Sequence, residues 1–215
     1  MEQEWMPFII SIKTALTATM ITFFLGIFAA NKINKINPKH KGILDSLFTL
    51  PMVLPPTVIG FFLLVILGRN GFIGKLLYSI GINVIFSWGA TVIAAVVVSF
   101  PLMYSTAKGA FEQIDKNILN AAQTMGVSNF KIFWKIMIPL AWPGIAAGTI
   151  LSFARALGEF GATLMIAGNI PGKTQTIPLA IYFAAEGGDI QGALTWVYTI
   201  FGIDRKSTRL NSSHT

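Results

Sequence analysis

The sequence predicts an all-α polytopic membrane protein with about five transmembrane helices. Its residues are 53% hydrophobic and 12% charged, whereas soluble domains carry about 25% charged residues. The apolar residues also lie in long blocks, and a helix needs about 20 of them to span a bilayer. Polar stretches such as "NKINKINPKHK" separate the blocks. Composition and pattern together therefore disfavour a soluble domain.

Five apolar runs are the expected membrane spans. No short hydrophobic segment with a small-residue cleavage site precedes the first run, so we expect that run to be a retained helix. The glycine-rich stretch "GRNGFIGKLLYSIGINVIF" is long enough for a short interfacial helix. The runs extend from about Phe8 to Ala30, Ile43 to Leu67, Trp88 to Ala107, Ile136 to Ala167 and Ile190 to Ile203.

The last two runs do not have the length of one straight span. The fourth is too long, and Gly158 and Gly161 lead us to expect a break in it near the outer surface. The fifth has about 14 residues, fewer than the roughly 20 that a crossing needs. We expect residues 1–203 to form one ABC importer-like transmembrane domain with a truncated fifth helix, and residues 204–215 to be a non-native or disordered tail. A short natural polar tail is the alternative.

Three prolines mark the second run. Pro51, Pro55 and Pro56 lack a backbone N–H, so they bend the helix that contains them. A bent helix suits the lining of a path that opens and closes, and these prolines are candidates for the translocation pathway. A helix kinked only for packing is the alternative.

The distribution of lysine and arginine predicts the orientation, because cytoplasmic loops carry an excess of both. The loops after the first and third runs hold more of these residues than the opposite side, so we expect the N-terminus outside and the lysine-rich loops in the cytoplasm. The cytoplasmic set is Lys32, Lys35, Lys39, Lys41, Lys108, Lys116, Lys131 and Lys135, and the outer set is Arg69, Lys75 and Lys173.

Several function classes are disfavoured. The chain has no cysteine, and His40 and His214 form no ligand pair, so no metal site is expected. No GxxxxGK[ST] loop occurs, so we expect no ATPase activity and no cofactor bound by this chain. The net charge of +7 is explained by the lysine-rich loops, so nucleic acid is not an expected partner. An intramembrane enzyme is an unfavoured alternative, because the deep-lying acids Asp45 and Glu159 are on different helices.

The stretch between the third and fourth runs is amphipathic. Asp115 is a candidate N-cap for a short helix that ends near Met125, where Gly126 permits a break. Ser128 is a candidate N-cap for a second helix that runs toward Ile138. Two short helices joined at a glycine suit either a lipid headgroup surface or a partner protein.

The same stretch resembles the EAA motif of ABC importer permeases, which reads E-A-A, three residues, G, nine residues, I-x-L-P. Asn120 stands where the motif has glutamate, which removes one charge and the basis for a salt bridge, and Ile138 stands where it has leucine. The resemblance implies a cytoplasmic coupling helix docked on an ABC ATP-binding subunit, which uses ATP and Mg. Ala121 and Ala122 allow close approach, and Lys131 can meet acidic groups or lipid phosphates. The expected coupling residues are Asn120, Ala121, Ala122, Gly126, Lys131, Ile136, Ile138 and Pro139.

Three longer segments resemble the molybdate ABC transporter permeases of the binding-protein-dependent inner membrane component family. They are "LPMVLPPTVIGFFLLVILGRNGFIG", "SFPLMYSTAKGAFEQID" and "FARALGEFGATLMIAGNIPGKTQTIPLAIY". The resemblance implies molybdate import across the inner membrane by a homodimer of this chain, with an ABC subunit, an external molybdate-binding protein and surrounding lipid. Sulfate/thiosulfate or tungstate import is the alternative, and a secondary transporter, which should show an internal repeat, is a more distant one.

Two charged residues lie inside the fourth run. Arg155 and Glu159 are four apart on one helix and can neutralise each other. The second hypothesis is that Arg155 faces the pathway and favours a passing oxyanion, while Glu159 prevents tight trapping. In the following loop, Thr174 and Thr176 are expected to face the outside, either against a binding protein or as plain surface.

Overall fold

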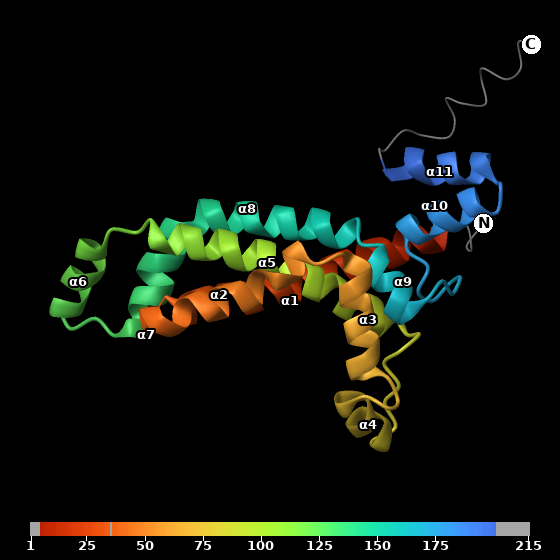
Figure 1. The fold of residues 1–215 in the computed structure, drawn as a ribbon. Helices are drawn as coiled ribbons and strands as arrows, with labels where there is room; N and C mark the ends of the chain where they lie inside the picture. The colour runs from red at the N-terminus through yellow and green to blue at the C-terminus, as the bar shows by residue number, and fades with distance from the viewer. Residues whose placement is uncertain (1–4, 35, 201–215) are drawn as a thin grey trace, which may run out of the picture.

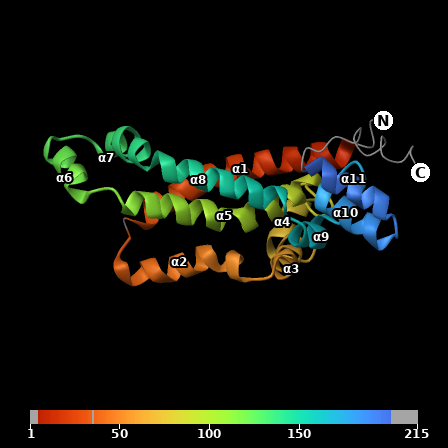
Figure 2. The ribbon, with the colours of Figure 1, turned by 90° about the horizontal axis from the view of Figure 1, so that it is seen from above.

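The computed structural model describes residues 5–34 and 36–200, which form helices and loops without a strand. Three long helices make the body of the molecule: α1 (Met6–Ile33), α5 (Trp88–Glu112) and α8 (Ile138–Leu157). They lie side by side (Figure 1, Figure 2). α5 is the central helix of the three. In its most apolar stretch of 18 residues, 61% of the residues are buried, against 39% in the corresponding stretch of α1 and 28% in that of Asn129–Leu157.

The shorter elements gather at the two ends of this body. α6 and α7 lie at one end, here called the α6 end, and α9, α10 and α11 lie at the other, the α9 end (Figure 1). α3 and α4 extend sideways from the long axis (Figure 1). The bounds are α2 (Pro38–Val53), α3 (Pro56–Leu67), α4 (Phe72–Ser79), α6 (Lys116–Thr124), α7 (Asn129–Ile132), the π-helical turn η2 (Phe133–Met137), α9 (Gly161–Ala167), α10 (Ile177–Glu186) and α11 (Ile190–Ile200).

The helices confirm the predicted all-α multi-pass class. Met6–Ile33, Trp88–Glu112 and Asn129–Leu157 are long and apolar enough to cross a membrane, and the bent pair His40–Val53 and Pro56–Leu67 makes a fourth crossing if it is one span. The fifth expected run begins in α11. Its last residues, 201–203, and the predicted tail, 204–215, lie outside the described residues.

Small and hydroxylated residues bring the three long helices close together. Ala15 and Ala18 of α1, Ala95 of α5 and Ala156 of α8 form one buried cluster. A β-carbon placed on Gly26 of α1 would lie only 2.7 Å from Cγ of Met103, so glycine is needed there for the approach of α5. Such small-residue contacts are typical of helices packed in membranes, where lipid offers no competing hydrophobic gain.

Two threonines and a tryptophan pair their polar side chains between α1 and α5. The hydroxyls of Thr14 on α1 and Thr91 on α5 lie 3.2 Å apart, and the indole N–H of Trp88 donates to Thr14 Oγ1 at 3.0 Å. A buried hydroxyl without a partner would cost free energy, so these pairs fix how α1 and α5 face each other.

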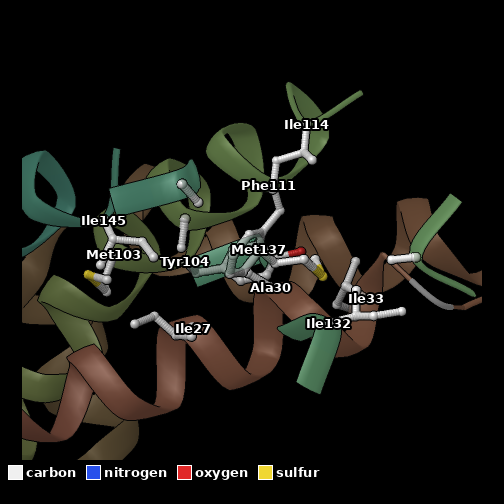
Figure 3. Packing of buried hydrophobic residues seen from close by; sticks show 13 residues of the cluster. Ile27, Ala30, Ile33, Met103, Tyr104, Phe111, Ile114, Ile132, Met137 and Ile145 are labelled. Carbon is white, nitrogen blue, oxygen red and sulfur yellow. The ribbon is translucent and has the colours of Figure 1, made fainter. Parts of the chain in front are cut away.

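A second cluster of apolar side chains fastens α6 and α7 to the body (Figure 3). Side chains of α1, α5 and α8 converge in it, and Ile114, Ala122 and Ile132 extend it past the end of α5. The segment around α6 is therefore packed onto the long helices. The buried members of this α6-end cluster are Ile27, Ala30, Ile33, Met103, Tyr104, Ala107, Phe111, Ile114, Ala122, Ile132, Met137, Ala141 and Ile145.

Candidate coupling segment and translocation path

The candidate coupling segment begins with the short helix α6, which is joined at a glycine to a second helix, as predicted, although that second helix is not short. The Asp115 carboxylate accepts a hydrogen bond of 2.8 Å from Asn117 N and begins α6, and Ser128 Oγ accepts from Lys131 N at 3.5 Å at the start of α7. Gly126 has φ of +76°, a left-handed conformation that L side chains rarely adopt. Both predicted caps and the glycine break are confirmed.

The end of α6 is a Schellman motif, which explains the role of this glycine. The N–H of Val127 donates to Ala122 O at 3.1 Å, and the N–H of Gly126 donates to Gln123 O at 2.9 Å. These are the two bonds that close a helix through a left-handed residue. The chain therefore turns sharply at Gly126 and presents the tip of the segment away from the body (Figure 1).

The structure separates the two alanines of the motif. Ala121 is exposed, whereas Ala122 is 8% exposed and belongs to the α6-end cluster. Consecutive residues of a helix point about 100° apart, so only one of the two can lie on the open face. Ala122 anchors the segment, and the expectation that both alanines face a partner is wrong for it. Asn120, Gly126 and Lys131 are exposed.

Apolar side chains that the sequence analysis did not select surround this tip. Met125 is 81% exposed, Phe130 73% and Trp134 52%. The rings of Phe130 and Trp134 lie 6.4 Å apart. The sequence could have indicated these exposed side chains. They flank a short, polar segment that is too small to bury them in a core of its own.

The second helix of the segment does not stop at Pro139. α7, η2 and α8 form one apolar helix, Asn129–Leu157. The N–H of Ile138 reaches back to Phe133 O, which is the five-residue spacing of a π turn, and Pro139 follows directly. Proline has no N–H to donate and is tolerated in a first turn. The widened turn therefore absorbs Pro139 where the sequence predicted a boundary.

The prolines of the second run produce a sharp break. α2 and α3 are bent by 111° relative to each other at Leu54 and Pro55. Pro55 is extended, with φ of −56° and ψ of 136°, and neither Pro55 nor Pro56 can donate a helical hydrogen bond. A residue that precedes proline also avoids the helical region, which affects Leu54. Pro51 lies inside α2, so the predicted bend is formed by Pro55 and Pro56.

The fourth run breaks near its predicted glycines. α8 ends at Leu157 and α9 begins at Gly161. Arg155 Nη1 lies 2.7 Å from Glu159 Oε2, with side chains 31% and 2% exposed. This contact is an ion pair whose alignment falls short of a hydrogen bond. The other oxygen, Oε1, accepts a hydrogen bond of 2.8 Å from Ala162 N.

Fold topology brings the two breaks together. A β-carbon placed on Gly161 would lie 3.2 Å from Cβ of Pro56 and 3.2 Å from N of Thr57. Gly60 is equally close to α9, because its β-carbon would lie 2.8 Å from Cα of Ala162. The break at Pro55 and Pro56 therefore meets the break after α8 at Gly161, two residues beyond the candidate pathway residue Glu159.

Two threonines of the loop between α9 and α10 are buried, although we expected them to face the outside. Thr174 is 0% and Thr176 4% exposed, so neither faces the outside. Thr174 Oγ1 donates to Gly168 O at 3.1 Å and accepts from Ile170 N at 3.0 Å, which closes the loop on itself. The interpretation of these threonines as outward-facing was wrong, because both side chains are buried. The Thr174 hydroxyl closes the loop, whereas Thr176 Oγ1 is buried without a hydrogen-bond partner among the described residues.

Comparison with known proteins matches residues 22–203 to the family of binding-protein-dependent transport system inner membrane components. The chain belongs to this family. The match includes the capped segment, the π turn and both helix breaks, so these features lie within the family's shared domain. The permease is therefore a membrane component of a binding-protein-dependent transport system.

Individual relatives are similar over most of their length. The putative molybdenum transport system permease protein YvgM of Bacillus subtilis is 49% identical over 195 residues, covering 90% of this chain and 86% of that protein. The molybdenum transport system permease protein ModB of Escherichia coli is 43% identical, covering 93% and 88%. ModB of Haemophilus influenzae is 45% identical, covering 89% and 85%.

Proposed function

We propose that this permease carries molybdate inward as the transmembrane subunit of an ATP-binding-cassette importer of the cytoplasmic (inner) membrane. The observation that carries the proposal is the similarity to YvgM of Bacillus subtilis, 49% identical over 90% of this chain, with the two ModB proteins at 43% and 45%. Sequence identity at this level over nearly whole chains favours a shared substrate class.

The α6 tip is the proposed docking site for an ABC ATP-binding subunit, which would bind and hydrolyse ATP with Mg. Asn120, Ala121 and Lys131 are exposed there beside Met125 and Phe130, which are 81% and 73% exposed. An exposed surface of small and polar side chains beside protruding apolar ones is suited to a groove in a partner protein. Asn120 supplies an amide and no charge, so docking would rest on shape and apolar contact.

The remaining motif residues have a supporting role in this proposal. Ala122 is buried in the α6-end cluster, and Ile136 and Ile138 pack against that cluster. Pro139 follows the π turn that makes the segment continuous with α8. A push on the α6 tip would therefore reach the long helices through packed side chains.

The proposed orientation places the α6 end in the cytoplasm and the N-terminus outside. The eight lysines of the predicted cytoplasmic loops support this orientation through the positive-inside rule. An external molybdate-binding protein would then deliver the anion at the α9 end. The bend of α2 and α3 and the break of α8 and α9 meet near that end (Figure 1).

A second copy of the chain would complete the pathway. Only 28% of the most apolar window of Asn129–Leu157 is buried, so most of this helix faces lipid or another subunit. The Arg155 side chain is 31% exposed in the last turn of α8, beside the break between α8 and α9. Facing the pathway, its charge would favour an oxyanion, and the ion pair with Glu159 would weaken retention so that the anion can leave.

The experiment is uptake of labelled molybdate into proteoliposomes that contain this permease, a cognate ABC ATPase subunit and a cognate molybdate-binding protein. We expect uptake that requires ATP, that tungstate inhibits and that sulfate does not. Competition by sulfate would exclude the molybdate assignment while the importer class stands. Uptake without the ATPase would indicate a secondary transporter and would falsify the proposed role of the α6 tip.

The pathway role of Arg155 has its own test in the same vesicles. Arg155→Gln should lower the uptake rate or change the preference between molybdate and sulfate. An unchanged rate and preference in a normally assembled transporter would leave Arg155 with a purely structural role.

A further inference from the structure

Paired charges join α2 to α5 near the α6 end. Lys41 Nζ lies 2.7 Å from Glu112 Oε1, and Lys108 Nζ lies 2.5 Å from Asp45 Oδ2. The hydroxyl of Tyr104 donates a hydrogen bond to the other oxygen of Asp45. The five side chains cross from one helix to the other, and we refer to them as the α2–α5 ladder.

The ladder has an antiparallel order. Lys41 and Asp45 are one turn apart on α2, and Tyr104, Lys108 and Glu112 occupy three successive turns of one face of α5. Residue numbers rise along α2 in the direction in which they fall along α5, so Lys41 pairs with Glu112 and Asp45 with Lys108. The aromatic rings continue the order, since Phe48 lies 5.1 Å from Tyr104 and 5.4 Å from Phe100 between ring centroids.

The charge pattern permits only one register. A slip of α2 by one turn, about 5.4 Å, would place Lys41 opposite Lys108 if it moved one way. A slip in the other direction would place Asp45 opposite Glu112. Like charges would then face each other across the helix pair, which is the device that fixes register in paired helices elsewhere.

Apart from the ladder, α2 packs on the body through the partly buried side chains of Leu44 and Phe48. Between His40 and Val53 no residue of α2 is buried. The ladder charges are partly shielded, with Lys108 19%, Asp45 24% and Lys41 29% exposed in their side chains. Screening by water is weaker for such groups than for fully exposed pairs. The ladder is therefore a principal attachment of α2 to the body.

The ladder also lies directly beside the coupling segment. Glu112 is the last residue of α5, and Asp115, the N-cap of α6, follows three residues later. Ile114 between them is 9% exposed and belongs to the α6-end cluster. A displacement of α6 must therefore be passed to the end of α5 that carries Lys108 and Glu112.

We propose that the α2–α5 ladder makes α2 and the adjoining half of α5 one rigid unit, which transmits movement of α6 to the bend at Pro55 and so to the α3–α9 junction. The inference rests on the proposed function and assigns Lys41, Asp45, Tyr104, Lys108 and Glu112 as positioning residues for coupling. Without the ladder, α6 would move while α2 stayed behind.

The test measures anion uptake per ATP hydrolysed by the complete importer in proteoliposomes. Asp45→Lys places a cation beside Lys108, and Lys108→Asp places an anion beside Asp45 and Glu112. Each should lower uptake per ATP by about fivefold or more, the lower range of coupling between distant sites. The double variant, Asp45→Lys with Lys108→Asp, restores opposite charges and should recover most of the ratio. Lys32→Asp is the matched control. Lys32 is an exposed lysine in the last turn of α1 and is not part of the ladder.

A distance measurement tests rigidity directly. The chain has no cysteine, so cysteines introduced at the exposed positions His40 and Gln113 can carry one pair of spin labels in each copy of the chain. Mixing labelled with unlabelled permease keeps the measured distance within one copy. The separation of the two labels should stay constant between nucleotide states in the unsubstituted ladder and should change between states in Asp45→Lys.

Two results would overturn the proposal: full uptake per ATP in both single variants, or a label distance that changes during coupled transport. A chain with an intact ladder that shows no ATP-dependent uptake would instead contradict the proposed function. The two failures are therefore distinguishable.

Discussion

Ser11 Oγ accepts a hydrogen bond of 2.8 Å from the backbone N–H of Ile177, which lies 166 residues further along the chain. Ile177 is the first residue of α10, and its N-cap Thr176 makes no side-chain cap bond. Ser11 of α1 thus supplies the acceptor that a neighbouring cap residue normally supplies to a helix start. The α9 end is held to the body by this buried contact.

Ser11→Ala should lower the free energy of unfolding by about 1–3 kcal/mol, because it leaves a buried N–H without an acceptor. Ser79→Ala is the control, since the Ser79 hydroxyl donates only to Leu76 O at the surface. Thermal denaturation of the purified permease in detergent compares the two. Equal midpoints would show that Ile177 finds another acceptor.

Arg155→Gln should destabilise the permease more than Glu159→Gln. The first change leaves the 2%-exposed carboxylate of Glu159 without its cation, at a cost of about 3 kcal/mol, the lower end for a buried pair because Arg155 is 31% exposed. The second change removes the buried charge and keeps an oxygen that can accept from Ala162 N. The same denaturation measurement ranks them, and the reverse order would contradict the account of Glu159 as the residue that needs its partner.

Gly60→Ala should separate α3 from α9. Its β-carbon would lie 2.8 Å from Cα and 2.9 Å from O of Ala162, and backbone cannot move aside as a flexible side chain can. We expect a loss of about 1–3 kcal/mol from overpacking. Gly109→Ala meets nothing within 4 Å and should be neutral or stabilise α5 by up to about 1 kcal/mol. A harmless Gly60→Ala would mean that the junction is looser than its geometry indicates.

Gly126→Ala should disturb the coupling segment through backbone strain alone. Gly126 has φ of +76° with nothing within 4 Å, so an added methyl meets no obstacle and the cost is the left-handed conformation, about 1–2 kcal/mol. Gly126→Asn should be tolerated better, because asparagine adopts this region more readily. Binding of the partner ATPase, measured by co-purification, should fall for alanine and be largely kept for asparagine. Equal binding by the unsubstituted permease and both variants would show that the conformation of Gly126 does not affect docking.

Much of the candidate site was predictable because its signals are local. Asp115, Gly126 and Ser128 act on backbone groups within a few residues, so their roles as caps and break can be derived from sequence alone. The alternatives for Arg155 and Glu159 included the ion pair for the same reason, since both residues lie on one helix. The buried Thr174 and Thr176 were misjudged, because the polarity of a residue does not reveal whether the folded chain covers it; only Thr174 uses its hydroxyl inside the loop.

The sequence by itself determined the all-α membrane class, the approximate positions of the three long helices, the bend at Pro55 and Pro56, and the capped segment after α5. These depend on apolar length, missing N–H groups and short-range hydrogen bonds. Only the tertiary structure decided that the two helix breaks meet at Gly161, that Ala122 points inward, and that Lys41 faces Glu112 and Asp45 faces Lys108. Those relationships depend on how distant helices pack and in which register, and residue spacing along the chain does not contain that information.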